Sequence, residues 1–204
     1  MAFELVIATK NKKKLEEIKE ILKGLDCKIS SLAGCAELPR IIENGKTFQA
    51  NAVKKAVKIA RFTKKLTLGE DSGLCIDALS GGPGVYSSRF SGKNKSDIQN
   101  NLKVLRLLEK IPLNKRNAHY VCAAALADKH GLIGVVEGKC SGLIGFEQKG
   151  SFGFGYDPLF IIPKYKKTFA QLGAGIKHKI SHRYHALKKA RKIIQKYVEK
   201  YSSS

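Results

Sequence analysis

The hydrophobic pattern begins with a continuous run, followed by a helical repeat. Residues Phe3 to Ala8 are typical of a buried strand, and the next apolar residues recur at helical spacing up to a stop at Gly24. These repeated positions are Leu15, Ile18, Ile21, Leu22 and Leu25. A second strand is expected near Cys27 to Leu32. Strand, helix and strand in this order predict an α/β sheet.

The middle of the chain repeats this alternation. A second helix is predicted from Thr47 to about Lys65, with Asn51 and Lys55 four residues apart on one face and most of the lysines opposite the apolar stripe. We then expect a short strand before Glu70 and another over Leu74 to Ala78. A third helix is expected over Ser96 to Leu108, capped by Ser96 or Asn94.

The second half reads as a hairpin, a loop, a strand and a helix. The segments "NAHYVCAAALAD" and "GLIGVVEGKCSG" predict two strands that turn around Lys129 to Gly131. The Gly-rich loop "KGSFGFGYDPLFIIP" leads into a further strand, and a long amphipathic helix begins near Ser181. We expect one domain over residues 1–204, which has enough apolar residues (43%) for a substantial core.

Targeting and redox signals are weak. No apolar run approaches the roughly 18 residues of a membrane span, and the N-terminal charges follow the apolar stretch, the reverse of a signal peptide. We therefore expect a cytoplasmic protein. The five cysteines are far apart and odd in number, which indicates small buried thiols rather than a zinc site or disulfide framework: Cys27, Cys35, Cys75, Cys122 and Cys140.

The charge changes the list of possible partners. The sequence has 38 Lys plus Arg against 17 Asp plus Glu, a formal net charge of +21, which suggests polyanions: nucleic acid, a membrane surface or a multiply charged small substrate. Solvated helix faces account for most of these lysines. A nucleic-acid-binding module is the alternative class, but no recognised nucleic-acid-binding motif accompanies the charge.

Two turns carry candidate phosphate chemistry. The turn "TKNKKK" lies between a strand and a helix, where free N–H groups and the positive helix end attract anions, although a solvated basic turn explains it equally well. The adjacent acids Glu70 and Asp71 in "GEDSG" follow an apolar run, the usual position for side chains at the carboxyl end of a strand. They suit Mg²⁺, which carboxylates and phosphate oxygens commonly hold; a structural pair capped by Arg or Lys is the alternative.

Two further motifs are suited to a flat ligand. The loop "GSFGFGYDP" is rich in glycine and aromatic residues, so it could bring backbone and a ring face close to a base, or pack its own aromatics. The segment "SHR" combines a helix cap with the donors His182 and Arg183.

Together these segments resemble the inosine triphosphate pyrophosphatase family, the non-canonical purine (dITP/XTP) pyrophosphatases. The resemblance covers nearly the whole chain, through "ATKNKKKLEEIKEIL", "ENGKTFQANAVKKA", "EDSGLCIDALSGGPGVYSSRFSG", "FGYDPLF" and "KHKISHRYHAL" in this order. It implies a two-lobed α/β fold with a long mixed sheet and a central cleft, and a homodimer. The implied reaction is Mg²⁺-dependent hydrolysis of ITP, dITP and XTP to the monophosphate and pyrophosphate.

The resemblance also implies roles for individual residues. The triphosphate cradle is expected at Thr9, Lys10, Asn11, Lys12, Lys13 and Lys14. Asp71 is expected as general base and metal ligand, and Ser72 as a substrate contact. The nucleoside pocket is expected at Phe154, Gly155, Tyr156, Asp157, Lys177, His182 and Arg183. Arg183 only donates hydrogen bonds, so it suits the 6-oxo group of hypoxanthine or xanthine and rejects adenine.

Three positions depart from the family pattern. Lys13 stands where Gly is common, Ser88 where Ala is common, and Ala50 where "TFxENA" has Glu. The last change leaves Glu43 and Glu70 as candidate helpers of Asp71, with Glu43 expected as the second metal ligand. A nucleotide hydrolase that prefers another base is an alternative closer to this function than the nucleic-acid-binding module.

Overall fold

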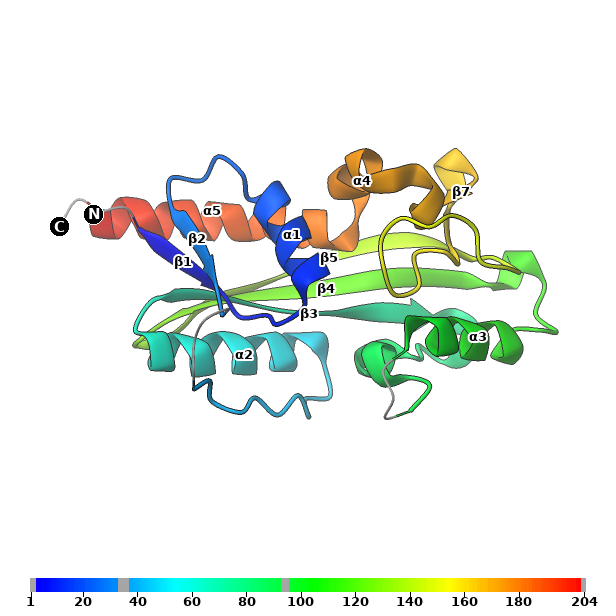
Figure 1. Ribbon diagram of the computed structural model, residues 1–204, viewed down its shortest axis with the longest axis horizontal. Helices are drawn as coiled ribbons and strands as arrows, with labels where there is room; N and C mark the ends of the chain where they lie inside the picture. The colour runs from blue at the N-terminus through cyan, green and yellow to red at the C-terminus, as the bar shows by residue number, and fades with distance from the viewer. Residues whose placement is uncertain (1–2, 33–36, 93–95, 203–204) are drawn as a thin grey trace. The chain divides into compact units, whose positions relative to one another are not determined.

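The structure is a computed structural model, which describes residues 3–32, 37–92 and 96–202 (Figure 1). One sheet has the strand order β2-β1-β3-β4-β5-β6-β7. Its strands are β1 (Glu4–Ile7), β2 (Lys28–Ser31), β3 (Leu66–Ile76), β4 (Asn117–Asp128), β5 (Gly131–Ile144), β6 (Phe160–Ile162) and β7 (Lys167–Thr168). The helices are α1 (Lys12–Ile21), α2 (Phe48–Thr63), α3 (Asp97–Leu107), α4 (Phe169–Ile180) and α5 (His182–Ser202). β1 is parallel to β2 and β3, whereas β6 is antiparallel to β5 and β7, which confirms the predicted α/β class with a mixed sheet.

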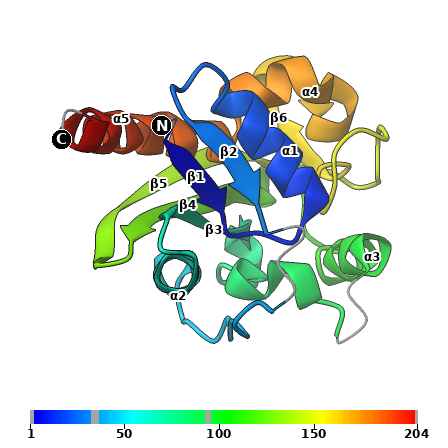
Figure 2. The ribbon, with the colours of Figure 1, turned by 60° about the vertical axis from the view of Figure 1, so that its left-hand side comes forward.

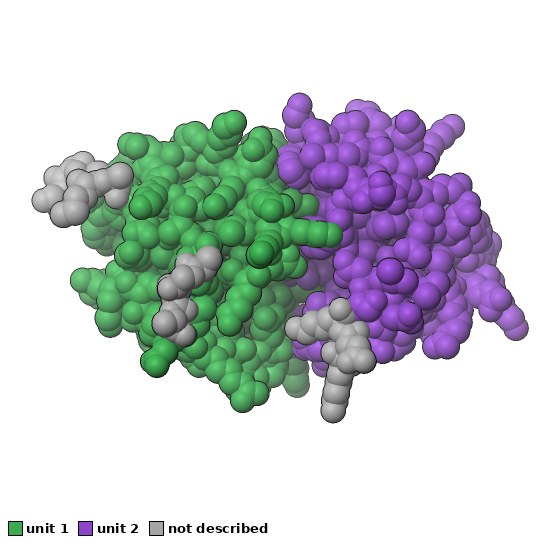
Figure 3. All heavy atoms as spheres, in the orientation of Figure 1, with its two compact units in different colours: residues 1–71, 122–138, 183–204 green, residues 72–121, 139–182 purple. Residues whose placement is uncertain are grey.

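The chain divides into two compact units (Figure 3). Unit 1 contains residues 1–71, 122–138 and 183–204, and unit 2 contains residues 72–121 and 139–182. Each unit is therefore assembled from separate stretches of sequence. The central cleft that the family resemblance implies stays a prediction.

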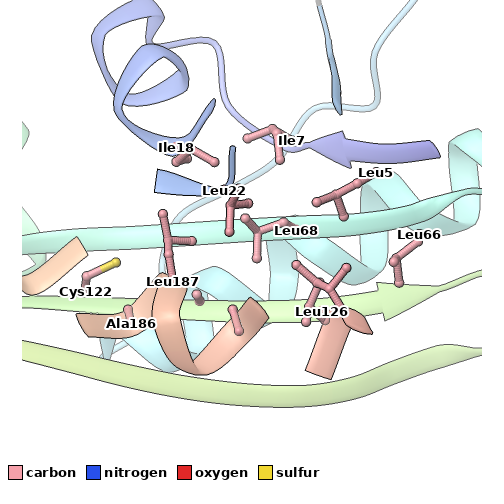
Figure 4. Packing of buried hydrophobic residues seen from close by; sticks show 13 residues of the cluster. Leu5, Ile7, Ile18, Leu22, Leu66, Leu68, Cys122, Leu126, Ala186 and Leu187 are labelled. Atoms are coloured by element: carbon pink, nitrogen blue, oxygen red, sulfur yellow. The ribbon is translucent and has the colours of Figure 1, made fainter. Parts of the chain in front are cut away.

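Unit 1 has its core between β1, β3, β4 and the helices α1 and α5. Figure 2 shows β1 beside β2. On its other side β1 pairs in parallel with β3, with Leu5 opposite Leu66 and Ile7 opposite Leu68. Figure 4 shows this cluster, in which Ile18 of α1 and Leu22, the residue directly after α1, are as fully buried as the strand residues. Burial of each such side chain stabilises the fold by about 1.5–3 kcal/mol. The core thus fixes α1, whose N-terminus follows the turn after β1.

Unit 2 has an aromatic core. The rings of Tyr120 and Phe160 lie 4.7 Å apart between centroids, and those of Phe160 and Phe169 lie 5.3 Å apart. Leu74 and Ile76 of β3 pack in the same cluster. This core supports the Gly-rich loop that precedes β6.

Several sequence predictions need correction. The two short strands expected around Glu70 are one continuous strand, β3, so "GEDSG" lies within a strand rather than after one. The helix α4 and the two-residue strand β7 were not predicted. Gly173 interrupts α4 with φ +73, which weakens its helical sequence pattern.

The expected cap of the third helix is confirmed, and the expected burial of the cysteines is confirmed in part. Ser96 caps α3, since its Oγ accepts from the Gln99 N–H at 3.3 Å; the alternative cap, Asn94, lies outside the described residues. Cys122 is buried as expected, whereas Cys27, Cys75 and Cys140 are half-buried, and Cys35 lies outside the described residues. No helix in the described part of the chain is long and apolar enough to cross a membrane.

Candidate active site

The turn between β1 and α1 presents a positive helix end. Asn11 caps α1, because its Oδ1 accepts from the Lys14 N–H at 3.1 Å, and its own N–H donates to Thr9 Oγ1 at 3.2 Å. The first turn of α1 holds lysines and no acid. Lys10, Lys12 and Lys13 are exposed around it. Helix dipole and cations therefore favour an anion here over a merely solvated turn.

Helix α2 lies against β3 at Gly69, where the backbones approach closely. A Cβ on this residue would lie 2.4 Å from the Ala52 oxygen and 2.5 Å from the Ala56 nitrogen, so only glycine allows this packing. Asn51 and Lys55 each precede one of these alanines. The close approach therefore carries both polar side chains to β3, two residues beyond Gly69.

Asp71 is the carboxylate that these two side chains hold. Lys55 Nζ lies 2.9 Å from Asp71 Oδ1, and Asn51 Nδ2 donates to Oδ2 at 3.1 Å. Burial raises the pKa of Asp71 above its usual value, and the Lys55 ammonium offsets part of that effect. The carboxylate is thus poorly solvated and fixed in orientation, as a general base needs to be.

Lys55 is shared between two carboxylates. Its Nζ also lies 2.7 Å from Oε2 of Glu43, and it donates to the Glu70 carbonyl at 3.1 Å. Burial alone would lower the pKa of Lys55, but Asp71 and Glu43 outweigh it and raise the pKa. Lys55 stays charged and draws the Glu43 and Asp71 oxygens toward one point.

Glu70 belongs to a different network on the opposite face of β3, because successive strand residues point to opposite sides. Its Oε1 accepts from Arg183 Nη2 at 3.0 Å and from the Cys122 thiol at 3.3 Å, and its Oε2 lies 3.1 Å from Lys14 Nζ. Arg183 Nη1 donates to Glu17. All of these groups except Lys14 are buried.

The buried network is charge-balanced. Burial opposes the charge of Arg183, but Glu70 and Glu17 outweigh it and raise the pKa of its guanidinium. Burial, with Glu70 beside it, raises the pKa of Cys122 well above its usual value, so this residue stays a neutral donor. Lys14 therefore connects the first turn of α1 to an interior network in which the positive charges of Lys14 and Arg183 balance the negative charges of Glu17 and Glu70.

These contacts distinguish the two candidate helpers of Asp71 and favour Glu43. Glu70 is committed to Arg183, Lys14 and Cys122, whereas Glu43 is partly exposed and shares a lysine with Asp71. The described residues hold no group of three His, Cys, Asp or Glu side chains that could bind a metal by itself. Two convergent carboxylates still fit Mg²⁺, which usually takes one or two of them and completes its shell with phosphate and water.

In unit 2, Asp157 organises the glycine and aromatic loop. Its Oδ2 accepts from the Phe154 N–H at 2.9 Å and from Lys177 Nζ at 2.6 Å, and that Nζ lies 4.7 Å from the Phe154 ring centroid. Gly153 has φ +86, and a Cβ there would lie 2.1 Å from Asp157 Oδ2. The geometry joins three of the residues expected in the nucleoside pocket.

His182 and Tyr156, also expected in the nucleoside pocket, and Ser72, expected as a substrate contact, have different surroundings in unit 2. The His182 ring stacks on Tyr120 at 4.5 Å between centroids and 11° between planes. The Tyr156 side chain is buried in the core, and its hydroxyl donates to the Ser87 carbonyl at 2.8 Å. Ser72 is half-buried within β3. Tyr156 therefore anchors the loop, and the face of Phe154 remains the better candidate for a base.

Three residues of these networks had no role assigned from the sequence: Asn51 and Lys55, which were noted only as a pair on one helix face, and Glu17. The prediction that most lysines of the second helix are solvated is wrong for Lys55, which is buried with Asn51 one helical turn away. A signal existed, since two polar residues at i and i+4 interrupt the apolar side of α2. Glu17 lacked such a signal, because its partner Arg183 is 166 residues away in the sequence.

Known proteins share both the sequence and the fold. The dITP/XTP pyrophosphatase of Desulforamulus reducens is 48% identical over 193 residues, which cover 95% of this chain and 96% of that protein. The protein of the same name from Shouchella clausii is 45% identical, covering 94% and 96%. A HAM1 protein structure from Coxiella burnetii has a TM-score of 0.86 at 38% identity, covering 95% and 99%.

A further solved structure, described as a nucleoside-triphosphatase / dITP/XTP pyrophosphatase from Mycobacterium abscessus, has a TM-score of 0.75 at 36% identity, covering 92% and 97%. The family model described as the Ham1 family matches residues 5–193. These findings confirm the resemblance seen in the sequence motifs. The chain belongs to the Ham1 family.

Proposed function

We propose that this protein is a Mg²⁺-dependent dITP/XTP pyrophosphatase, which hydrolyses ITP, dITP and XTP to the monophosphate and pyrophosphate and so cleanses the nucleotide pool. The observation that carries the proposal is Asp71, a buried carboxylate fixed by Lys55 and Asn51. The names of the relatives support the substrate class. The pool lies in the cytoplasm, where we expect the enzyme to act as a homodimer.

The triphosphate is bound at the N-terminus of α1. Free N–H groups of the first turn and the side chains of Lys12, Lys13 and Lys14 neutralise its charge, and Thr9 and Asn11 shape the turn. Lysine at position 13 adds a cation where the family often has glycine. Phosphoryl chemistry needs such positioning and charge neutralisation more than covalent help.

Asp71 acts on the water. Its carboxylate orients a water molecule and accepts its proton as the oxygen attacks the α-phosphorus, and pyrophosphate leaves toward the lysines of α1. Lys55 and Asn51 hold the two Asp71 oxygens in place during this step. Asp71 and Glu43 would hold Mg²⁺, which supplies further neutralisation of the triphosphate when bound.

The choice among purine bases rests on the hydrogen-bond donors of Arg183 and on the aromatic ring of Phe154. Arg183 has five N–H donors, so holding Glu17 and Glu70 is compatible with donation to a 6-oxo group. Phe154 offers a stacking face, with Lys177, Asp157 and His182 as polar contacts. Adenine presents a 6-amino donor instead of an acceptor, a mismatch that costs about 1–3 kcal/mol or more.

Glu43→Gln should raise the Mg²⁺ concentration for half-maximal activity about 10-fold, because a neutral amide is a poorer ligand for a hard cation. Activity at saturating Mg²⁺ should fall less. Titration of the rate with MgCl₂ measures both. Glu37→Gln, an exposed acid of the same segment, is the control; equal titration curves for the two variants would remove Glu43 from the metal site.

Lys55→Met should lower kcat/KM for ITP by about 10- to 100-fold, the loss expected for a charge-assisted hydrogen bond to a buried group. Asp71 and Glu43 would then face each other without the shared cation. Steady-state kinetics measure the effect, and Lys54→Met, whose side chain contacts Asn44 instead, is the matched control. Similar kinetics for both variants would argue against the role given to Lys55.

The reaction type is tested by hydrolysis of ITP in H₂¹⁸O. Attack at the α-phosphorus places the label in the monophosphate and leaves pyrophosphate unlabelled. Label in pyrophosphate would place the attack at the β-phosphorus, and release of orthophosphate would indicate attack at the γ-phosphorus. Either result would overturn the proposed reaction.

A further inference from the structure

The loop residue Gly155 is held by one helix at both of its backbone polar groups. Asp97 and Asn101 of α3 are four residues apart and therefore on one face of the helix. The Gly155 N–H donates to Asp97 Oδ2 at 2.8 Å, and Asn101 Nδ2 donates to the Gly155 carbonyl at 3.0 Å. The same Asn101 amide donates to Gln148 Oε1 at 3.1 Å, so it ties two points between β5 and β6 to α3.

The helix that holds Gly155 is itself anchored. Asn100 Oδ1 accepts from the Ser91 N–H at 2.7 Å, and its amide donates to the Ser87 carbonyl at 3.3 Å. Tyr156, directly after Gly155, donates to the same carbonyl. Asn100, Asn101 and Tyr156 are all buried. The helix that holds Gly155 is therefore anchored to other buried groups of unit 2.

This position needs such a hold. Gly155 has φ +63, and Gly153 has φ +86, so Phe154 lies between two glycines in the left-handed region. Glycine has the largest conformational freedom in a flexible chain, and ordering it costs backbone entropy. Within the loop, Asp157 Oδ2 supports the neighbouring Phe154 N–H, and α3 adds the hold on Gly155.

We propose that Asp97 and Asn101 are positioning residues for base recognition. They fix Gly155, so that the Phe154 ring stays beside Lys177 and is ordered before the nucleotide arrives. This inference rests on the proposed function, in which the Phe154 face receives the base. In this proposal α3 orders the loop around Phe154 and Gly155 but does not itself contact the substrate.

Amide hydrogen exchange at Gly155 tests the hold directly, in the full-length protein without nucleotide. Asp97→Ala removes the acceptor and should speed exchange of this amide about 3- to 10-fold. Asp97→Asn keeps an acceptor oxygen and should restore most of the protection. Gln99→Ala, an exposed residue of the same helix, is the matched control. Equal exchange in Asp97→Ala and Gln99→Ala would overturn the inference.

Steady-state kinetics test the consequence. Asp97→Ala should raise KM for ITP about 3- to 10-fold with kcat changed less than about 2-fold, and Asp97→Asn should recover most of the affinity. Asn101→Ala should do the same in preparations whose melting curve shows a folded protein. Faster exchange with an unchanged KM would overturn the positioning role and leave the proposed function intact.

A wild-type chain that hydrolyses no purine triphosphate would instead overturn the proposed function, and with it the role of α3 in base recognition. The two failures are therefore distinguished by the wild-type rate, which is measured first in the same assay.

Discussion

Asp71→Asn should lower kcat for ITP by at least about 100-fold, and up to about 10,000-fold, while nucleotide binds nearly as before. The amide keeps the size of the carboxylate, and its one oxygen can still accept from Lys55, although its NH₂ group can no longer accept from Asn51. It is not basic enough to accept a proton from water. Single-turnover kinetics and equilibrium binding of ITP separate the chemical step from affinity.

The control for this variant is Asp26→Asn, an exposed carboxylate of the same unit. It should have wild-type kcat. An Asp71→Asn enzyme with near-normal kcat would remove Asp71 from the role of base. A loss confined to nucleotide affinity would make it a binding residue only.

Arg183→Ala should lower the free energy of unfolding by about 3–5 kcal/mol, because it leaves the buried carboxylates Glu17 and Glu70 without their shared cation. In folded protein, the ratio of kcat/KM for ITP to that for ATP should also shrink. Urea denaturation measures the first effect and parallel kinetics with the two nucleotides the second. Lys192→Ala, exposed on the same helix, is the control.

A second variant protects this prediction against simple misfolding. Arg183→Lys keeps the charge but not the planar fork, so it should recover part of the stability while still narrowing the ITP to ATP ratio. A stable Arg183→Lys enzyme with an unchanged ratio would limit Arg183 to the interior network. An Arg183→Ala protein as stable as Lys192→Ala would contradict the buried network itself.

The fold was readable where a pattern is local. The first strand, α1 and α2 follow from periodicity, and the cap expected for α3 is confirmed, since Ser96 accepts from the N–H three residues on. β3 was divided in two because its acids and glycines interrupt the apolar run. The reason they do so is tertiary: Gly69 admits α2, and Glu70 and Asp71 meet partners from other elements on opposite faces.

The candidate site likewise has parts that local motifs predict and parts that only contacts between distant residues reveal. The lysine-rich turn and the acid pair were visible as motifs, and the resemblance named the loop around Phe154. Glu43 was expected as the second metal ligand from the sequence, but the ion pairs that set it apart from Glu70 join residues distant in sequence, such as Glu70 with Arg183. The hold of α3 on Gly155 likewise joins residues 58 positions apart, which no local pattern indicates.

The measurement that tests the central claim most directly is pyrophosphate release from ITP, XTP, GTP and ATP in parallel, with Mg²⁺ and with a chelator, on the purified protein. We expect Mg²⁺-dependent release from ITP and XTP far above that from GTP and ATP. Absence of release from all four, together with nucleic-acid binding that weakens steeply with salt, would contradict it.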